Sequence, residues 1–204
     1  MTDSIRLLLA DDQALVRGAM SALLGVERDL EVVGEVGRGD QVLAAVRELA
    51  VDVALLDVEM PGMDGIAVAG QLSEHAPRTR SLIVTTFGRP GYLRRALDAG
   101  AAGFVVKDTP AEELADAVRR VHQGLRVVDP ALATESLLEG NNPLTERERE
   151  ILRLAVDGRP VADVARELSL SVGTVRNHLS SAVAKTGAVS SVQAAVVARD
   201  RGWL

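Results

Sequence analysis

The sequence predicts an α/β protein: a doubly wound parallel sheet of five strands, followed by a small all-α domain of four helices. Between residues 5 and 121, short apolar runs alternate five times with segments of helical periodicity. This alternation is typical of parallel strands covered by helices on both faces. From residue 144 onward the pattern is helical throughout. A length of 204 residues is enough for two modest domains.

The first part of the chain is expected to form five strand–helix units. The runs are apolar at nearly every position, which indicates strands buried on both faces. In the intervening stretches apolar residues recur every three or four positions, as expected of helices with one buried side. The expected strands are 5–10, 30–36, 51–56, 81–86 and 103–106, and the expected helices are 12–24, 41–49, 66–75, 90–99 and 110–121.

Residues 124–142 are expected to link a first domain, 1–123, to a second, 143–204. Residues 125–128 are interpreted as a short extended piece, and Asp129-Pro130 as the start of a small helix reaching Leu138. In the second domain Thr145 and Glu148 form a capping box that opens a helix. The expected helices there are 146–156, 161–168, 172–186 and 190–201.

Composition excludes several classes of protein. The absence of cysteine excludes disulfides and thiolate catalysis, and three scattered histidines do not predict a zinc site. There is no secretory leader and no long apolar run, so we expect a cytoplasmic protein with no membrane insertion. Residues 1–142 carry a net charge of −8 and residues 143–204 a net charge of +2. The C-terminal part is therefore the candidate for nucleic-acid contact.

Charged residues follow three of the expected strands. Asp11 and Asp12 come after the first strand, Asp57 after the third and Lys107 after the fifth. Because ligands of open α/β sheets bind beyond the carboxyl ends of the strands, these side chains are expected to meet. Three carboxylates offer the hard oxygen ligands that suit Mg²⁺, and an ammonium group supplies a second positive charge. We therefore predict a metal-assisted phosphoryl site, with a carboxylate as acceptor and the Thr85 hydroxyl beside it.

These residues resemble the receiver domain of bacterial two-component response regulators, which has a flavodoxin-like fold. The resemblance is carried by Asp11-Asp12, Asp57 with Met60-Pro61-Gly62, Thr85, Phe104 and Lys107. It implies that a sensor histidine kinase phosphorylates Asp57. It implies that Mg²⁺ is bound by Asp12, Asp57 and the main-chain carbonyl of Glu59, with Asp11 assisting through water. It also implies that Lys107 and Thr85 contact the phosphoryl group, and that Thr85 and Phe104 shift together.

Residues 161–186 have helix-turn-helix form. In the second helix the apolar residues are expected to face inward (Val172, Val175, Leu179 and Val183) and the polar ones outward (Arg176, Asn177, Ser180 and Ser181). Arginine and asparagine are suited to bidentate reading of guanine and adenine edges in the major groove. Lys185 and Arg166 are candidates for contacts with phosphates.

The stretch Gly173-Thr174-Val175-Arg176-Asn177-His178-Leu179, with Leu144-Thr145 and Arg147-Glu148 before it, resembles the C-terminal domain of NarL/LuxR-class regulators. The resemblance implies that Arg176, Asn177 and Ser180 face the bases of double-stranded promoter DNA. It implies that Thr174 and Lys185 contact the DNA backbone. The last helix, with Val192, Ala195, Val196 and Arg199, would pair two modules in a homodimer on activation, and RNA polymerase is a further candidate partner.

The sequence as a whole thus resembles a response regulator and transcription factor rather than an enzyme. Two alternatives stay open. One is a Mg²⁺-dependent phosphohydrolase with Asp57 as nucleophile, for which Glu59 is the only candidate acid/base. The other is a regulator that does not respond to phosphorylation.

Overall fold

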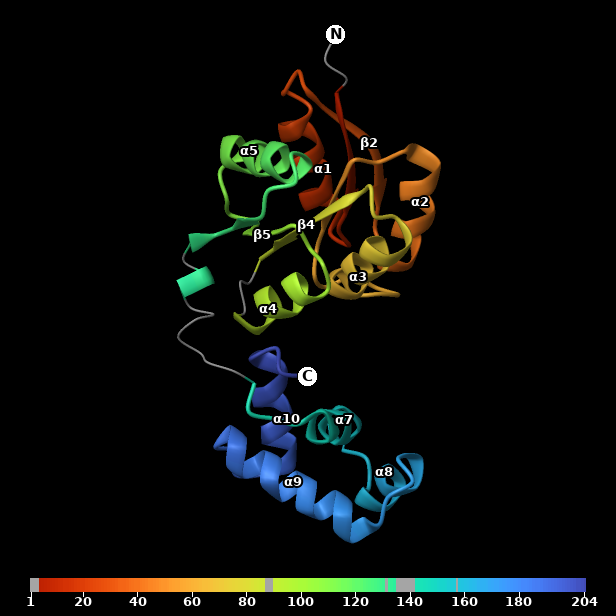
Figure 1. Ribbon diagram of the computed structural model, residues 1–204, viewed down its shortest axis with the longest axis vertical. Helices are drawn as coiled ribbons and strands as arrows, with labels where there is room; N and C mark the ends of the chain where they lie inside the picture. Colours follow the sequence, from red (N-terminus) through yellow and green to blue (C-terminus); the bar gives the residue numbers. More distant parts are fainter. Residues whose placement is uncertain (1–3, 87–89, 131, 135–141, 157) are drawn as a thin grey trace. The chain divides into compact units, whose positions relative to one another are not determined.

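The computed structural model describes residues 4–86, 90–130, 132–134, 142–156 and 158–204. The chain divides into two compact units, each with its own core (Figure 1). The sheet unit holds residues 4–86, 92–130 and 132–134, and the helical unit holds residues 142–156 and 158–204 together with residues 90 and 91. Within the described residues, no helix combines the length and the apolar character that crossing a bilayer requires.

The sheet unit alternates strands and helices along the chain. Its elements are β1 Ile5–Ala10, α1 Ala14–Leu24, β2 Leu30–Val36, η1 Gly39–Gln41, α2 Val42–Leu49, β3 Val53–Leu56, α3 Gly65–His75, β4 Arg80–Thr85, α4 Pro90–Asp98, β5 Gly103–Val106, α5 Ala111–His122 and β6 Val127–Val128. All the strand pairs are parallel, in the order β2-β1-β3-β4-β5-β6. The prediction of a doubly wound parallel sheet is confirmed.

The sheet has six strands in the described residues, so the predicted number of five is wrong. Val127 and Val128, expected only as an extended linker piece, pair with Gly103 and Phe104 of β5. Gly103 permits this approach, because a Cβ atom at that position would lie 2.8 Å from the carbonyl oxygen of Val127. Two residues form too short a run for periodicity to identify as a strand.

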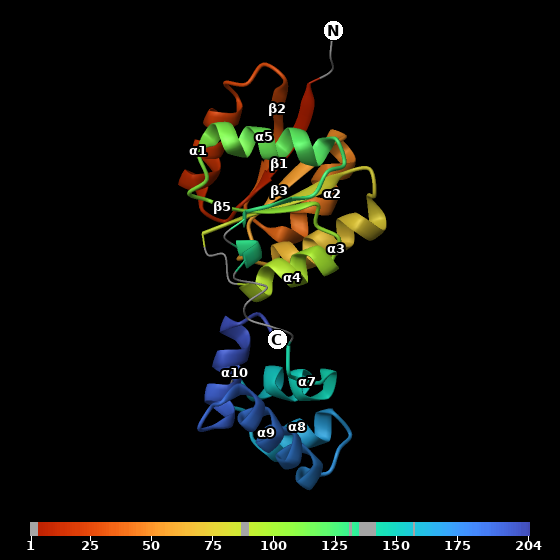
Figure 2. The ribbon, with the colours of Figure 1, turned by 60° about the vertical axis from the view of Figure 1, so that its left-hand side comes forward.

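Helices cover both faces of the sheet. Figures 1 and 2 show α1 and α5 on one face and α2, α3 and α4 on the other. Side chains alternate along β1, so Leu7 and Leu9 enter the core under α1 and α5 while Leu8 enters the opposite core. Each of these leucines is fully buried. Removing such a side chain from water stabilises the fold by about 1.5–3 kcal/mol.

Two helix starts bring main chain to the carboxyl ends of the strands. The helix expected from Asp12 begins instead at Ala14, because Asp11 Oδ1 accepts a hydrogen bond from Gln13 N at 2.9 Å and holds this turn outside the helix. Helix α3 starts at Gly65, where a Cβ atom would lie only 2.0 Å from the carbonyl oxygen of Asp57. A glycine is therefore needed for α3 to begin beside the candidate site.

The helical unit contains the four expected helices: α7 Glu146–Ala155, α8 Val161–Glu167, α9 Val172–Thr186 and α10 Ser191–Asp200. The capping box is confirmed, because Thr145 Oγ1 accepts from Glu148 N and Glu148 Oε2 accepts from Thr145 N. Ile151, Leu152 and Val175 are fully buried in its core.

Two expectations for the helical unit are wrong, and one for the linker lies outside the described residues. Val172 is 37% exposed, because it is the first residue of α9 and extends past the core. Ala195 is fully buried in the core of the helical unit, so it does not belong to an exposed pairing surface; the exposed valines of this region are Val189, Val192 and Val196. Residues 130 and 132–134 are helical, whereas the expected continuation of this helix to Leu138 lies outside the described residues.

Candidate functional site

The predicted charged side chains meet at the carboxyl ends of β1, β3 and β5. The carboxylates of Asp11, Asp12 and Asp57 each offer an oxygen within 4.8 Å of the other two. Lys107 Nζ lies 2.7 Å from Asp11 Oδ2 and 2.9 Å from Asp57 Oδ2. We call these four residues the acidic cluster. They come from three separate strand ends, as expected for a ligand site of an open α/β sheet.

Burial and ion pairing shift the pKa values of Asp57 and Lys107. Asp11 and Asp57 are buried, and Asp12 is exposed. Burial raises the pKa of Asp57, and the neighbouring Asp11 raises it further, while Lys107 opposes both effects. Burial alone would lower the pKa of Lys107, but pairing with two carboxylates outweighs it, so its pKa is raised. Lys107 is therefore charged, and with all three carboxylates ionised the cluster carries a net charge of −2.

The donor set fits a divalent cation such as Mg²⁺. All the side-chain oxygens are carboxylate oxygens, the hard ligands that Mg²⁺ prefers. Asp11 Oδ2 is fully buried and, although it lies close to Lys107, it accepts no hydrogen bond of ordinary geometry in the described residues. This oxygen has lone pairs to spare for a cation or for a water that the cation binds.

Main-chain hydrogen bonds hold the strand ends in register. Asp57 N donates to Ala10 O, and Lys107 N donates to Thr85 O, each at 2.8 Å. Arg17 adds a side-chain brace that sequence reasoning missed: its guanidinium donates to the carbonyl oxygen of Asp11 at 2.5 Å. The sequence did carry a signal for Arg17: a cation in the first turn of a helix opposes the helix dipole and therefore indicates another role.

Thr85 and Phe104 lie on neighbouring strands and point to the same face of the sheet. In the parallel register Ile83 pairs with Phe104, and Thr85 lies two residues beyond Ile83 on β4. Because side chains alternate with a period of two, Thr85 and Phe104 share a face. Thr85 is 3% exposed and Phe104 is fully buried. Both side chains are therefore buried on one face of the sheet, on neighbouring strands.

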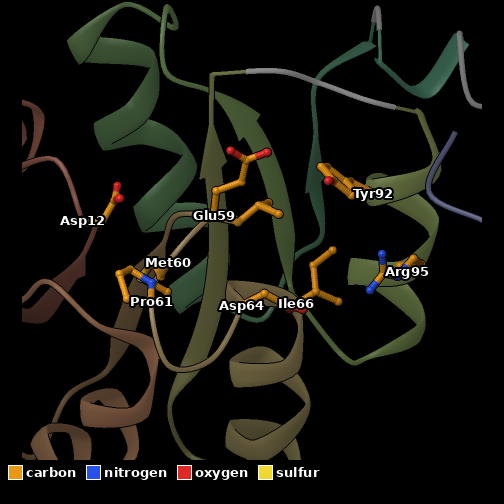
Figure 3. Close-up of a pocket in the computed structure, with 9 residues that line it drawn as sticks. Asp12, Glu59, Met60, Pro61, Asp64, Ile66, Tyr92 and Arg95 are labelled. Carbon is orange, nitrogen blue, oxygen red and sulfur yellow. The ribbon is translucent and has the colours of Figure 1, made fainter. Parts of the chain in front are cut away.

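A pocket of about 360 Å³ opens beside the acidic cluster (Figure 3). The loop after β3 forms one wall with Glu59, Met60 and Pro61, and α4 forms another with Tyr92 and Arg95. Arg95 Cζ lies 5.9 Å from the centroid of the Tyr92 ring. The pocket provides room for a small molecule or a side chain next to Asp12. Sequence reasoning did not find Tyr92 and Arg95, since a helix-face residue gives no signal by its spacing alone.

The helix-turn-helix presents the predicted polar side chains. The left-handed backbone of Ser169, with a φ of +54°, makes the turn between α8 and α9. Arg176, Asn177 and Ser180 are exposed on α9, while Thr174 is half-buried with its Oγ1 2.8 Å from Ser171 Oγ. Among the described residues, neither Arg176 nor Asn177 has a side-chain hydrogen-bond partner. The face is available for a ligand.

A buried carboxylate joins α7 to α9. Glu148 is 3% exposed, and its oxygens accept from Ser181 Oγ at 2.6 Å and from Lys185 Nζ at 2.9 and 2.7 Å. Burial would raise the pKa of Glu148, but these hydrogen bonds and that from Thr145 lower it to about 2. Ser181, expected to face outward, instead turns toward Glu148. Lys185, the expected DNA-backbone contact, also uses its ammonium group here and is one-third exposed.

Comparison with known protein families gives two matches on this chain. Residues 7–119 match the response regulator receiver domain. Residues 142–198 match the bacterial regulatory proteins of the luxR family. The first match spans the acidic cluster and most of the sheet, and the second spans the helix-turn-helix.

Individual relatives match over almost the whole chain. The uncharacterized transcriptional regulatory protein YvfU of Bacillus subtilis is 43% identical over 200 residues, covering 98% of this chain and all of that protein. The transcriptional regulatory protein DesR of the same organism is 40% identical over 199 residues, covering 98% of each chain. The crystal structure of the response regulator ChrA, from a haem-sensing two-component system, is 32% identical with a TM-score of 0.60, covering 98% of this chain and 99% of that one.

Proposed function

The chain belongs to the transcriptional response regulators that join a receiver domain to a luxR-family DNA-binding domain, and from this premise we propose that phosphorylation of Asp57 switches its binding to promoter DNA. We propose domain boundaries of 1–123 for the receiver, 124–142 for the linker and 143–204 for the DNA-binding domain. The observation that carries the proposal is the pairing of buried Asp57 with Lys107 inside a three-carboxylate cluster.

The proposed chemistry is transfer of a phosphoryl group to Asp57. An oxygen of the Asp57 carboxylate attacks phosphorus, the bond from phosphorus to the kinase histidine nitrogen breaks, and an acyl phosphate forms. Mg²⁺, when bound, would neutralise charge shared by carboxylate and phosphoryl oxygens. Asp12, Asp57 and the main-chain carbonyl of Glu59 would hold it, with Asp11 acting through water. Lys107 pairs with the phosphoryl oxygens from the other side.

The proposed switch runs through Thr85 and Phe104. The Thr85 hydroxyl hydrogen-bonds a phosphoryl oxygen, and its movement changes the room available to Phe104 on the same face of the sheet. Phosphorylation thereby shifts an equilibrium between two forms of the receiver. The favoured form dimerises and brings two DNA-binding domains onto one promoter.

The proposed DNA contacts lie on α9. Arg176, Asn177 and Ser180 face base edges, and Thr174 contacts the backbone together with the remaining N–H of Lys185. Arg176 and Asn177 have the bidentate geometry that favours guanine and adenine. The sensor histidine kinase and RNA polymerase complete the proposed set of partners, in the cytoplasm.

The experiment is phosphorylation by acetyl phosphate with Mg²⁺, read by the intact mass of the protein. Wild type should gain one phosphoryl group, and Asp57→Asn should gain none. Rapid turnover of p-nitrophenyl phosphate would instead favour the phosphohydrolase, with Glu59 as acid/base. DNA binding that is the same with and without the modification would favour a phosphorylation-independent regulator.

A further inference from the structure

The chain that follows α5 is held against the edge of β5. Val127 N donates to Ala102 O at 3.0 Å, and Asp129 N donates to Phe104 O at 3.2 Å. With the β5–β6 pairing, these bonds fix the main chain of residues 127–129 along the strand. We call residues 125–130 and 132–134 the linker segment. It forms the sixth strand and the helical turn beyond it.

Leu132 anchors the far end of the linker segment. Its amide donates to Asp129 Oδ1 at 3.3 Å, and Ala133 N donates to Asp129 O at 3.0 Å, so Asp129 caps this turn. The Leu132 side chain is 7% exposed and belongs to the core between the sheet and α2, α3 and α4. Phe104 lies in the same core.

Phe104 is therefore connected to the linker segment in two ways. Its carbonyl oxygen holds the Asp129 amide, and its side chain shares a core with Leu132. Thr85 lies on the same face of the sheet, one strand away. Because close-packed interiors rearrange between discrete packings rather than deform continuously, a new position of the Phe104 side chain would change the core in which Leu132 is buried.

We infer that the linker segment is the output element of the receiver, docked on β5 while Phe104 is buried and held there more firmly when Asp57 is phosphorylated. This inference rests on the proposed function, since it takes Thr85 and Phe104 as the switch. While the linker segment is docked, the free tether that connects the receiver to the DNA-binding domain begins only after that segment. Release of the chain from Val127 to Leu132 would lengthen that tether by roughly 20 Å when extended. Docking thus restricts the separations that two paired DNA-binding domains can reach.

Amide hydrogen exchange of the full chain, resolved by residue, tests the inference. Beryllofluoride with Mg²⁺ serves as the phosphoryl mimic, and its binding is measured separately by calorimetry. We expect slower exchange at the Val127 and Asp129 amides. The Leu125 amide, which donates to Arg120 O at the end of α5, should not change. Unchanged or faster exchange at Val127 and Asp129 with the mimic bound overturns the inference. Absence of mimic binding overturns the proposed function instead.

Linkage gives a second test with matched variants. If docking and phosphorylation favour each other, loosening the linker segment must weaken beryllofluoride binding. Leu132→Ala should lower that affinity by about fivefold or more, within the range typical of coupled sites. Leu125→Ala, at a position that is 49% exposed in the same segment, is the matched control and should bind as wild type does.

Gly103→Ala keeps the test decisive if Leu132→Ala fails to fold. Its Cβ would lie 2.8 Å from the Val127 carbonyl oxygen, so β6 must move away. The other close atoms, Leu82 Cδ1 at 2.7 Å and Val121 Cγ2 at 3.3 Å, are the ends of side chains. Weaker beryllofluoride binding by this variant supports the inference. Wild-type affinity in a variant whose Val127 amide exchanges faster contradicts it.

Discussion

Lys107 donates to Asp57, with Nζ 2.9 Å from Oδ2, although the two residues are fifty positions apart in the chain. Both side chains are at least nine-tenths buried. This desolvated site requires Lys107, since removing it leaves the buried carboxylates of Asp11 and Asp57 without a cation. The same pair places the cation where a phosphoryl group on Asp57 would need it. Structure and proposed chemistry thus depend on one contact.

Removal of Lys107 should destabilise the metal-free receiver. In Lys107→Met the carboxylates of Asp11 and Asp57 lose their buried cation, and we expect a loss of about 3 kcal/mol in the free energy of unfolding. Urea unfolding in EDTA, followed by circular dichroism, measures it. The double variant Lys107→Met/Asp57→Asn should recover part of the loss. A loss of the same size in the double variant would contradict this account of the pair.

The raised pKa of Asp57 predicts how the effect of its substitution on stability depends on pH. The folded state binds this proton more tightly than the unfolded state, so Asp57 costs stability above its folded pKa, and this cost fades as pH falls toward about 4. In EDTA, Asp57→Asn should therefore be more stable than wild type at pH 7, by a margin that shrinks on acidification. Thermal unfolding measures the margin, with the exposed Asp98→Asn as control. An equal margin at pH 7 and at about pH 4, the unfolded pKa of an aspartate, would contradict the prediction.

The buried Glu148 predicts acid sensitivity of the helical unit. Because folding lowers its pKa from 4.5 to about 2, its contribution is present above about pH 4.5 and is lost as pH falls toward 2. We expect Glu148→Gln to be less stable at pH 7 by about 2 kcal/mol and to show a flatter dependence below pH 4.5. Trp203, the only tryptophan, is buried in this unit, so its fluorescence isolates the transition. Glu146→Gln, at an exposed carboxylate, is the control.

Substitution of Arg176 should lower DNA affinity alone, whereas substitution of Lys185 should also lower the stability of the helical unit. Arg176→Ala should cost about 1–3 kcal/mol in binding to a specific duplex and relax the preference at one base pair, with unfolding unchanged. Lys185→Met should lower the unfolding midpoint followed by Trp203, because it leaves Glu148 without its cation. Fluorescence anisotropy with labelled DNA measures the affinities. Equal effects of the two variants on stability would contradict these roles.

Much of the site was predictable because it depends on where strands end. Apolar runs located the ends of β1, β3 and β5, and parallel pairing requires those ends to lie at one edge, so Asp11, Asp57 and Lys107 had to meet. The sixth strand was not predictable as such, because its pairing depends on Gly103 and on the burial of Leu132 far from the motif residues.

The helical unit shows a second limit of sequence reasoning. Helical spacing placed Arg176 and Asn177 on the exposed face correctly. It did not reveal that Ser181 and Lys185 turn toward a buried carboxylate on another helix. Thr145 and Glu148 were recognised as a local cap, but the second function of Glu148 depends on how α7 packs against α9. Ala195 was misplaced for the same reason, since its environment is set by tertiary packing.

Sedimentation together with DNA binding, with and without Mg²⁺ and beryllofluoride, on wild type and Asp57→Ala shows most directly whether Asp57 is the switch. The DNA is a duplex selected from a random pool by the beryllofluoride-treated wild type. We expect beryllofluoride to dimerise wild type and to tighten its DNA binding, while Asp57→Ala is unaffected. If wild type and Asp57→Ala sediment and bind DNA alike under both conditions, Asp57 is not the switch.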